Sequence, residues 1–266
     1  MTTHSVILSP SALRLRILHL SQKTSALHIA PAFSCIELVV AAYEEFFNYK
    51  DFDFIVSKGH GYLAQLVALE SLGLIESIEL EKIGSKESIY GGHPDRGTPG
   101  IIASTGSLGH GLGIAVGISL GKKMEKSRNG DGAPTVVLIS DGELQEGSTW
   151  ESILNAPALG ATNLIRLIDN NDMQTRANTS ISHPGLYPIK SKMIDFGWDC
   201  FEVDGHSVPQ ITAALNSKRK EFPLCIIGKT VKGKGVSYME NSPIWHYRSP
   251  SIAEYEIAKS ELIGQE

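Results

Sequence analysis

Polar residues follow two neighbouring apolar runs of the sequence at the points where those runs end. Asp141 and Gly142 come after residues 135–140, and Asn171 comes after residues 163–169. The thirty positions from Asp141 to Asn171 accommodate one crossover helix, which would set two parallel strands side by side. Both side chains would then lie at the carboxyl edge of the sheet, where open α/β sheets bind ligands. Their oxygens suit Mg²⁺ or Ca²⁺, and Mg²⁺ commonly binds together with phosphates, so we expect a diphosphate-bearing ligand there.

Four histidines stand at expected turns or loops rather than on the periodic face of a helix: His28, His60, His93 and His246. Any one of them alone would most often be a surface histidine or one hydrogen-bonded within the structure. Imidazole is nevertheless the side chain best suited to moving protons near neutral pH. The four positions are therefore candidates for acid–base chemistry.

A glycine-rich turn at residues 104–109 precedes a predicted helix with glycine at every fourth position, from Gly109 to Gly121. Such a turn presents backbone N–H groups to an anion, although it could also serve only to start the helix. Glycine costs a helix about 1 kcal/mol relative to alanine, so the repetition suggests a backbone pressed against another element, such as a subunit interface.

The strands and helices that must position these residues alternate along the chain. We expect strands at 52–57, 135–140, 163–169, 198–203 and 223–229, and helices from Ser9, from a capping box at 34–37, over 62–72, from a second capping box at 148–151, after Pro188 and near Ser207. This order predicts an α/β fold, a parallel sheet with helices on both faces. We expect one domain over residues 1–266, with a C-terminal tail from about residue 252 that packs on the surface or against a partner.

Composition excludes several classes of protein. The chain has 266 residues, 42% of them hydrophobic, and a net charge of −5, which argues against a nucleic-acid-binding surface. Its one basic run, residues 218–220, ends a predicted helix. Residues 101–121 lack charged side chains but are too rich in glycine and polar residues for a lipid-facing helix, so we expect no membrane segment. Cys35, Cys200 and Cys225 lie in apolar runs without metal-binding spacing and are expected to be buried, reduced thiols.

The strings around the candidate residues resemble those of transketolases. Residues 141–147 read Asp-Gly-Glu-Leu-Gln-Glu-Gly and residues 168–174 read Ile-Asp-Asn-Asn-Asp-Met-Gln, the pattern of the thiamine-diphosphate motif. The resemblance extends over roughly residues 21–250. It implies the thiamine-diphosphate-binding fold, in its diphosphate-binding form, with thiamine diphosphate and Mg²⁺ (or Ca²⁺) as cofactors.

The resemblance also implies roles for individual residues. Asp141 and Asn171 would bind the metal through their side chains and Met173 through its backbone carbonyl, while Gly142 would let the diphosphate approach closely. The backbone of the turn would contact the cofactor through Gly106, Ser107 and Leu108.

The family's histidines line the substrate channel, where they hydrogen-bond to sugar hydroxyls and to the diphosphate. By resemblance His28, His60, His93 and His246 would take these roles, with His60 and His246 also contacting the cofactor. Glu146 matches a family glutamate near the contact between subunits, and it could equally be an ordinary carboxylate in the first turn of a helix.

The sequence departs from the family pattern at two places. His110 stands where we would expect Gln, which affects local hydrogen bonding but not backbone contacts. Residues 174–178 read Gln-Thr-Arg-Ala-Asn where the family usually continues with Ile-Asp-Gly after Gln. Arg176 in this loop could alter contacts with the substrate or a partner.

In transketolases the glutamate that activates the cofactor lies in a second domain, which this sequence does not show. We therefore expect the N-terminal subunit of a split transketolase, a cytoplasmic transferase that moves a two-carbon ketol unit from a ketose, sugar or sugar phosphate, to an acceptor. A separate C-terminal, pyrimidine-binding subunit would complete the site, giving a dimer of heterodimers, that is, a heterotetramer.

Two alternatives stay open. A subunit of another thiamine-diphosphate enzyme, either a dehydrogenase first component or a deoxyxylulose-phosphate-synthase-like protein, would share Asp141 and Asn171 but not the segments around His93 and His246. A catalytically silent binding or scaffold subunit would not need the metal-site pair and the four histidines together.

Overall fold

Five parallel strands form one sheet in the part of the chain that the structure describes. This computed structural model describes residues 7–129, 133–174, 177–217 and 221–264. The strands are β1 (Asp53–Val56), β2 (Thr135–Ser140), β3 (Leu164–Asn170), β4 (Asp199–Asp204) and β5 (Leu224–Lys229). Their order in the sheet is β1-β2-β3-β5-β4, and every neighbouring pair is parallel. The expected strands are therefore present, each within two residues of the predicted bounds.

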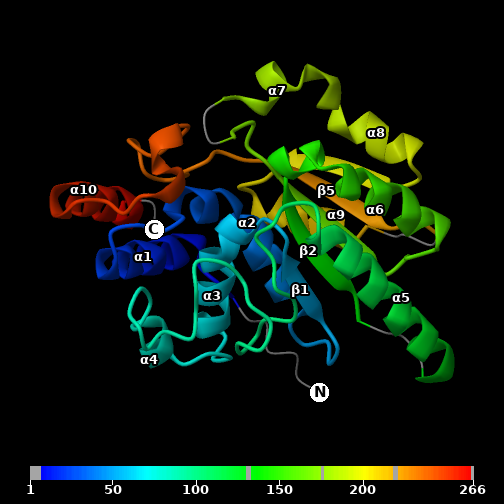
Figure 1. Cartoon of the computed structure of the whole chain (residues 1–266), viewed down its shortest axis with the longest axis horizontal. Helices are drawn as coiled ribbons and strands as arrows, with labels where there is room; N and C mark the ends of the chain where they lie inside the picture. Colours follow the sequence, from blue (N-terminus) through cyan, green and yellow to red (C-terminus); the bar gives the residue numbers. More distant parts are fainter. Residues whose placement is uncertain (1–6, 130–132, 175–176, 218–220, 265–266) are drawn as a thin grey trace.

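Helices cover both faces of the sheet (Figure 1). One face packs against a core that includes α1 (Pro10–Leu20), α2 (Ile29–Phe46), α3 (Tyr62–Ser71), α9 (Val208–Leu215) and α10 (Ile252–Ile263). The other face packs against α5 (Gly111–Asn129), α6 (Gly147–Ala158) and α8 (Ile189–Asp195). The short helices α4 (Ser77–Leu80) and α7 (Thr179–Ser182) lie in connecting segments. The central strands β2 and β3 are almost wholly buried, as expected for parallel strands covered on both sides.

Strand register fixes where the candidate site must lie. Ser140 of β2 pairs with Asp169 of β3, and Asp169 pairs in turn with Gly228 of β5. All three strands point the same way, so the segments that follow them emerge at one edge of the sheet. Asp141 and Asn171, which follow β2 and β3, therefore stand at the same carboxyl edge, as predicted.

Both predicted capping boxes are wrong. α2 begins at Ile29, so Ser34 lies inside the helix, where its hydroxyl donates to the carboxylate of Asp169 at 2.7 Å. α6 begins at Gly147, and the side chain of Ser148 donates to the carbonyl of Gly109 instead of capping its own helix. In both cases a tertiary hydrogen bond takes the hydroxyl that the local pattern assigned to the helix end. The box that does form, between Ser251 and Glu254, starts α10 in the expected tail.

The glycine pattern of α5 is only partly explained within this chain. A methyl group on Gly109 would lie 2.8 Å from Cβ of Glu146, so close packing requires glycine there. At Gly117 and Gly121 a methyl group would meet no atom of the described part of the chain within 4 Å, and both residues are exposed. The expected close contact is therefore met at the start of the helix, and the outer glycines stay candidates for a subunit interface.

None of the helices in the described ranges has the length and apolarity that a membrane crossing requires. All three cysteines are free and buried, as predicted. The basic run at residues 218–220 lies outside the described residues.

Candidate functional site

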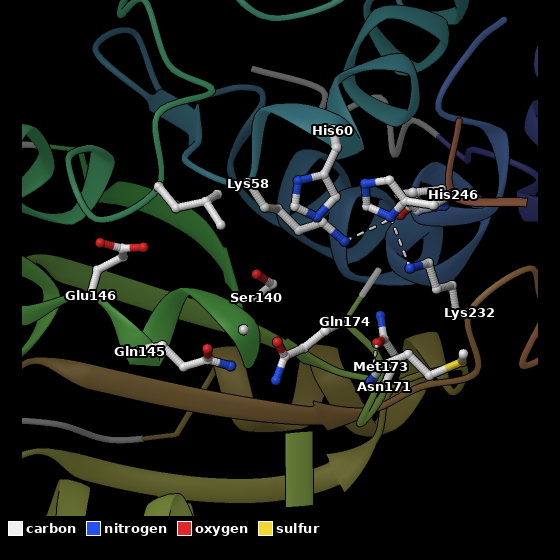
Figure 2. A pocket seen from close by; sticks show the side chains of 13 residues that line it. Lys58, His60, Ser140, Gln145, Glu146, Asn171, Met173, Gln174, Lys232 and His246 are labelled. Atoms are coloured by element: carbon white, nitrogen blue, oxygen red, sulfur yellow. Dashed lines mark hydrogen bonds between the residues drawn. The ribbon is translucent and has the colours of Figure 1, made fainter. Parts of the chain in front are cut away.

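A cavity of about 220 Å³ opens at the carboxyl edge of the sheet (Figure 2). Seven of the predicted site residues line it: His60, Leu108, Gly142, Glu146, Asn171, Met173 and His246. The remaining lining residues are Pro31, Lys58, Ser140, Gln145, Gln174 and Lys232. The cavity thus joins residues from separate segments of the chain at the edge where the sequence predicted a ligand.

Asp141 is buried beside this cavity, with 1% of its surface exposed. Its backbone N–H donates to the carbonyl of Asp169 at 3.2 Å, and its Oδ1 accepts the N–H of Gly142 at 2.9 Å. Burial, together with the negative charge of Asp169, raises the pKa of Asp141 from 3.8 to about 7. A carboxylate in this position is one that a bound cation would stabilise.

Asn171 is held so that its amide has one defined orientation. Its Nδ2 donates to Oγ of Ser34 at 2.9 Å and to Oδ2 of Asp169 at 3.2 Å, while its Oδ1 accepts the N–H of Met173 at 3.0 Å. The amide oxygen therefore lies on the side of Met173, whose carbonyl is the third predicted ligand. In the described residues no three His, Cys, Asp or Glu side chains form a metal-binding cluster, so the candidate donors are one carboxylate, one amide and one backbone carbonyl.

Asp169, which the sequence reasoning missed, holds several side chains at this edge of the sheet in place. Its carboxylate is fully buried and accepts hydrogen bonds from the hydroxyls of Ser34 and Thr230. It also forms a buried ion pair with Lys58. The Nζ of Lys58 donates a second hydrogen bond, to the carbonyl of Pro31 at 3.2 Å. Buried charges require partners of this kind, and here the partners also fix the orientation of Asn171.

Replacing Ser34 by alanine is expected to weaken both the fold and the metal site. The Ser34 hydroxyl donates to Asp169 and accepts from Asn171, so its loss leaves two buried groups short of a partner and costs about 1–3 kcal/mol. Because Asn171 is then less firmly oriented, Mg²⁺ affinity should fall about tenfold. Chemical unfolding and metal titration measure the two effects. Ser260→Ala, on the exposed face of α10, is the control, and equal behaviour of the two variants would contradict this role for Ser34.

The fold brings the four predicted histidines together. The ring of His28 lies 5.2 Å from that of His93, 5.5 Å from that of His246 and 6.2 Å from that of His60, measured between centroids. His60 and His246 are 5.3 Å apart. Burial is the main reason that the pKa of His28 falls to about 4, that of His246 to about 3, and that of His60 well below its usual value. These three imidazoles are therefore neutral near pH 7 and able both to donate and to accept a proton.

Lys232 is a second buried cation of the site, with 2% of its surface exposed. Its Nζ donates to Nδ1 of His246 at 2.9 Å, which places the proton of that neutral imidazole on Nε2. Burial and the neighbouring positive charge of Lys58 lower the pKa of Lys232 to about 8. Among the described residues, no carboxylate lies within ion-pair distance of Lys232, so an anion in the cavity would be its natural partner.

The glycine turn packs tightly against the histidines. Gly106 has a φ of +130°, and a methyl group there would lie 2.9 Å from the ring of His93. Gly59, which precedes His60, faces the same turn, since its methyl group would meet Cα of Gly106 at 2.7 Å. Only glycine fits at these two positions.

The start of α5 offers fewer free N–H groups than the sequence suggested. The N–H of Gly109 donates to Oε1 of Glu143 at 2.8 Å, and the N–H of Gly111 donates to Oγ of Ser57 at 3.1 Å. These two amides are therefore hydrogen-bonded within the chain and are not free to bind an anion. Of the three turn residues predicted to contact the cofactor, Leu108 lines the cavity, and Gly106 and Ser107 do not.

Glu146 is exposed, stands at the start of α6 and lines the cavity. His110, which replaces the expected Gln, is exposed, and its Nδ1 lies 3.2 Å from the carbonyls of Ser107 and Leu108. It thus closes the turn locally. Arg176 lies outside the described residues.

Several site residues escaped the sequence reasoning, namely Lys58, Gln145, Gln174 and Lys232, all of which line the cavity. A signal for the two lysines was present. Lys58 follows β1 and Lys232 follows β5, so both stand just beyond the carboxyl end of a strand, like Asp141 and Asn171.

The arrangement defines a class of protein: an α/β domain whose carboxyl edge gathers oxygen donors, two buried lysines and clustered histidines around one cavity. Comparison with known proteins identifies the family. Residues 25–262 match the family described as "Transketolase, thiamine diphosphate binding domain". The chain belongs to the transketolase family, as its thiamine-diphosphate-binding domain.

Two groups of relatives differ in how much of their length the chain covers. It is 34% identical to one of the subunits of the apulose-4-phosphate transketolase of Phocaeicola vulgatus, over 94% of this chain and 90% of that protein. It is 33% identical to the 6-deoxy-6-sulfo-D-fructose transketolase subunit SqwG of a Clostridium species, over 78% and 75% respectively. Human transketolase is 31% identical over 90% of this chain, which spans only 39% of the human protein.

The fold agrees with solved transketolase structures. The crystal structure of Campylobacter jejuni transketolase superposes with a TM-score of 0.86 over 95% of this chain and 42% of that one, at 24% identity. The predicted fold class, the thiamine-diphosphate-binding fold with helices on both faces of a parallel sheet, is confirmed.

Proposed function

We propose that this chain is the N-terminal subunit of a two-component transketolase, which transfers a two-carbon ketol unit from a ketose to an acceptor with thiamine diphosphate and Mg²⁺. The observation that carries the proposal is the cavity at the sheet edge. Asn171 and Lys232 line it, Asp141 is buried beside it, and two of the four clustered histidines, His60 and His246, complete its lining. Relatives of similar length that are named as transketolase subunits support the division into two components.

The residues present fit the proposed cofactors. Asp141 has a raised pKa that a cation would bring down, and Asn171 and the carbonyl of Met173 complete a set of oxygen donors suited to Mg²⁺. Gly142 lines the cavity without a side chain to obstruct a diphosphate, and the buried ammonium of Lys232 supplies positive charge to it. His60 and Leu108 line the same cavity and would contact the cofactor from the side opposite the metal residues.

When bound, thiamine diphosphate supplies the carbanion chemistry needed to break a ketose beside its carbonyl group. The chain's own residues then move protons at the sugar hydroxyls. His246 can donate from Nε2, because Lys232 occupies its Nδ1. His28 and His60 are neutral by burial, so each can accept a proton from one hydroxyl or return it to another. His93 contacts His28 and faces the exposed side of the cluster, where the substrate would enter.

Two relatives support a proposal for the substrate class. Their names specify ketoses that carry a phosphate or a sulfo group. We propose that this chain also acts on a ketose with an anionic group, such as a sugar phosphate.

The partner is proposed to be a C-terminal, pyrimidine-binding transketolase subunit, in a dimer of heterodimers in the cytoplasm. Glu146 lines the cavity and is exposed, which suits a residue near the contact between subunits. The exposed glycines of α5, Gly117 and Gly121, extend from the same region and would permit close approach of another backbone. Residues 1–266 would form one domain of this assembly.

Reconstitution tests the proposal. The chain, a candidate C-terminal partner and a mixture of the two are assayed with thiamine diphosphate and Mg²⁺ for ketol transfer from a panel of ketose phosphates to an aldose. Only the mixture is expected to be active. Full transfer by the chain alone would contradict the two-component assignment, and a mixture that binds the cofactor without transferring a ketol unit would favour the scaffold or another thiamine-diphosphate enzyme.

A further inference from the structure

Three residues form a row across neighbouring strands on the face of the sheet that α8 covers. Arg166 of β3 pairs in register with Cys225 of β5, and Cys225 pairs with Cys200 of β4. Side chains of residues paired in register point to the same face of a sheet. The row lies near the amino ends of β5 and β4, away from the carboxyl edge that carries the cofactor residues.

Arg166 is fully buried, yet no described carboxylate lies within ion-pair distance of it. Its guanidinium lies 4.3 Å from the ring centre of Trp198 and is in contact with the sulfur of Met193. Nη2 is also 3.2 Å from Sγ of Cys225, while Nε and Nη1 have no hydrogen-bond partner among the described residues. A buried guanidinium requires a negative charge, and the Cys225 sulfur is the group in contact that can carry one.

The electrostatics agree with this geometry. Burial opposes ionisation of Cys225, but the neighbouring Cys200 thiol and the positive charge of Arg166 outweigh it and lower the pKa of Cys225 to about 7. The interaction with Cys225, together with burial, raises the pKa of Cys200 above its usual range. Of the two thiols, Cys225 is therefore the one that ionises more readily.

The strands place the two cysteines within reach of a covalent bond. Neighbouring strands lie about 4.7–4.9 Å apart, and the Cα atoms of disulfide-bonded cysteines lie about 4.4–6.8 Å apart. Cys225 is completely buried, whereas 8% of Cys200 is exposed at the edge strand β4. A small oxidant would therefore approach from the side of Cys200.

We propose that Cys225 and Cys200 form an oxidisable thiol pair, in which Arg166 stabilises Cys225 as the attacking thiolate and hydrogen peroxide converts the pair to a disulfide between β5 and β4. The Cys225 thiolate attacks one peroxide oxygen; the O–O bond breaks, and the departing hydroxide takes up a proton to form water. Cys200 then attacks the sulfur of the Cys225 sulfenic acid; the S–O bond breaks, the S–S bond forms, and the Cys200 proton leaves with the oxygen as a second water. The two sulfurs are oxidised and one peroxide is reduced.

Cys35 provides an internal reference. It is buried in α2 on the opposite face of the sheet, and burial raises its pKa to about 12. Local oxidation of the pair should leave Cys35 untouched, whereas oxidation through general unfolding should consume all three thiols.

The test treats the folded full chain with hydrogen peroxide and then counts thiols after denaturation. The three thiols of the chain are expected to fall to one, the mass to drop by about 2 Da, and a peptide linking Cys200 to Cys225 to appear. Retention of all three thiols, parallel loss of Cys35, or conversion of Cys225 only to sulfinic acid would each overturn the proposal.

Two variants separate the roles. In Cys200→Ser the sulfenic acid at Cys225 should persist and be trapped by dimedone, with no disulfide; absence of the adduct would contradict Cys225 as the attacking residue. In Arg166→Met the oxidation should be at least about tenfold slower, because the thiolate loses its cation. Should that variant fail to fold, the wild-type thiol count and Cys200→Ser still decide the question.

Discussion

Replacing Asp141 by asparagine is expected to abolish Mg²⁺-dependent binding of thiamine diphosphate while making the metal-free chain more stable. The variant removes the one carboxylate of the proposed metal site, so metal affinity should fall at least about 100-fold. Stability should rise because the pKa of Asp141 is raised from 3.8 to about 7 by burial and by Asp169. Each pKa unit corresponds to about 1.4 kcal/mol, so the buried charge costs the metal-free chain at most roughly 4 kcal/mol above pH 7.

The sign of this effect gives a pH signature. The folded chain holds the Asp141 proton more tightly than the unfolded chain, so metal-free wild type loses stability as the pH rises from 3.8 through about 7. Asp141→Asn should lack this component, and its advantage should grow over the same interval. Thermal unfolding with EDTA at several pH values measures it, with Asp195→Asn at the exposed end of α8 as the control. A less stable variant that still binds the cofactor with Mg²⁺ would contradict the assigned role.

Replacing Lys232 by methionine is expected to remove the preference of the site for the diphosphate. Lys232 is buried, its pKa is lowered to about 8 by burial and Lys58, and its hydrogen bond goes to a neutral imidazole. A bound anion would offset the free-energy cost of burying the Lys232 charge. The variant loses this interaction with the diphosphate, so its affinity for thiamine diphosphate should fall about 10–100-fold. Affinity for thiamine, which lacks the diphosphate, should change little.

Calorimetric titration of both ligands into the assembled enzyme measures this difference. Lys259→Met, at an exposed position of α10, should behave as wild type. The metal-free Lys232→Met chain should also unfold at a higher temperature than wild type, because a methionine fills the space without a buried charge. Equal losses of affinity for thiamine and thiamine diphosphate would show that Lys232 shapes the cavity rather than binding the diphosphate.

The sheet and its carboxyl edge were predictable because strongly apolar runs end abruptly at polar residues. β2 and β3 are buried on both faces, which gives largely apolar sequence, and Asp141 and Asn171 mark the ends of those strands. The four histidines gather as the resemblance implied, yet nothing in their spacing of some thirty to 150 residues could have shown this without the family pattern.

Local patterns failed where tertiary contacts decided the outcome. Ser34 reads as a helix cap but lies within α2, where its hydroxyl is hydrogen-bonded to Asp169 and Asn171 of a distant segment. Asp169 and Arg166 look like ordinary polar residues in an apolar strand, and only the packing of helices over β3 shows that both are buried charges. The turn at residues 104–109 was expected to present its amides to an anion, yet the N–H of Gly109 at its end donates to Glu143 instead.

The proposed function requires a divalent cation held between the ends of β2 and β3, and a crystal structure of the assembled enzyme with thiamine diphosphate and Mn²⁺ tests this most directly. We expect an anomalous peak at coordination distance, about 2.0–2.2 Å, from the carboxylate of Asp141, Oδ1 of Asn171 and the carbonyl of Met173, with the diphosphate on its far side near Lys232. A cofactor bound elsewhere, or a cation that touches neither Asp141 nor Asn171, would contradict it.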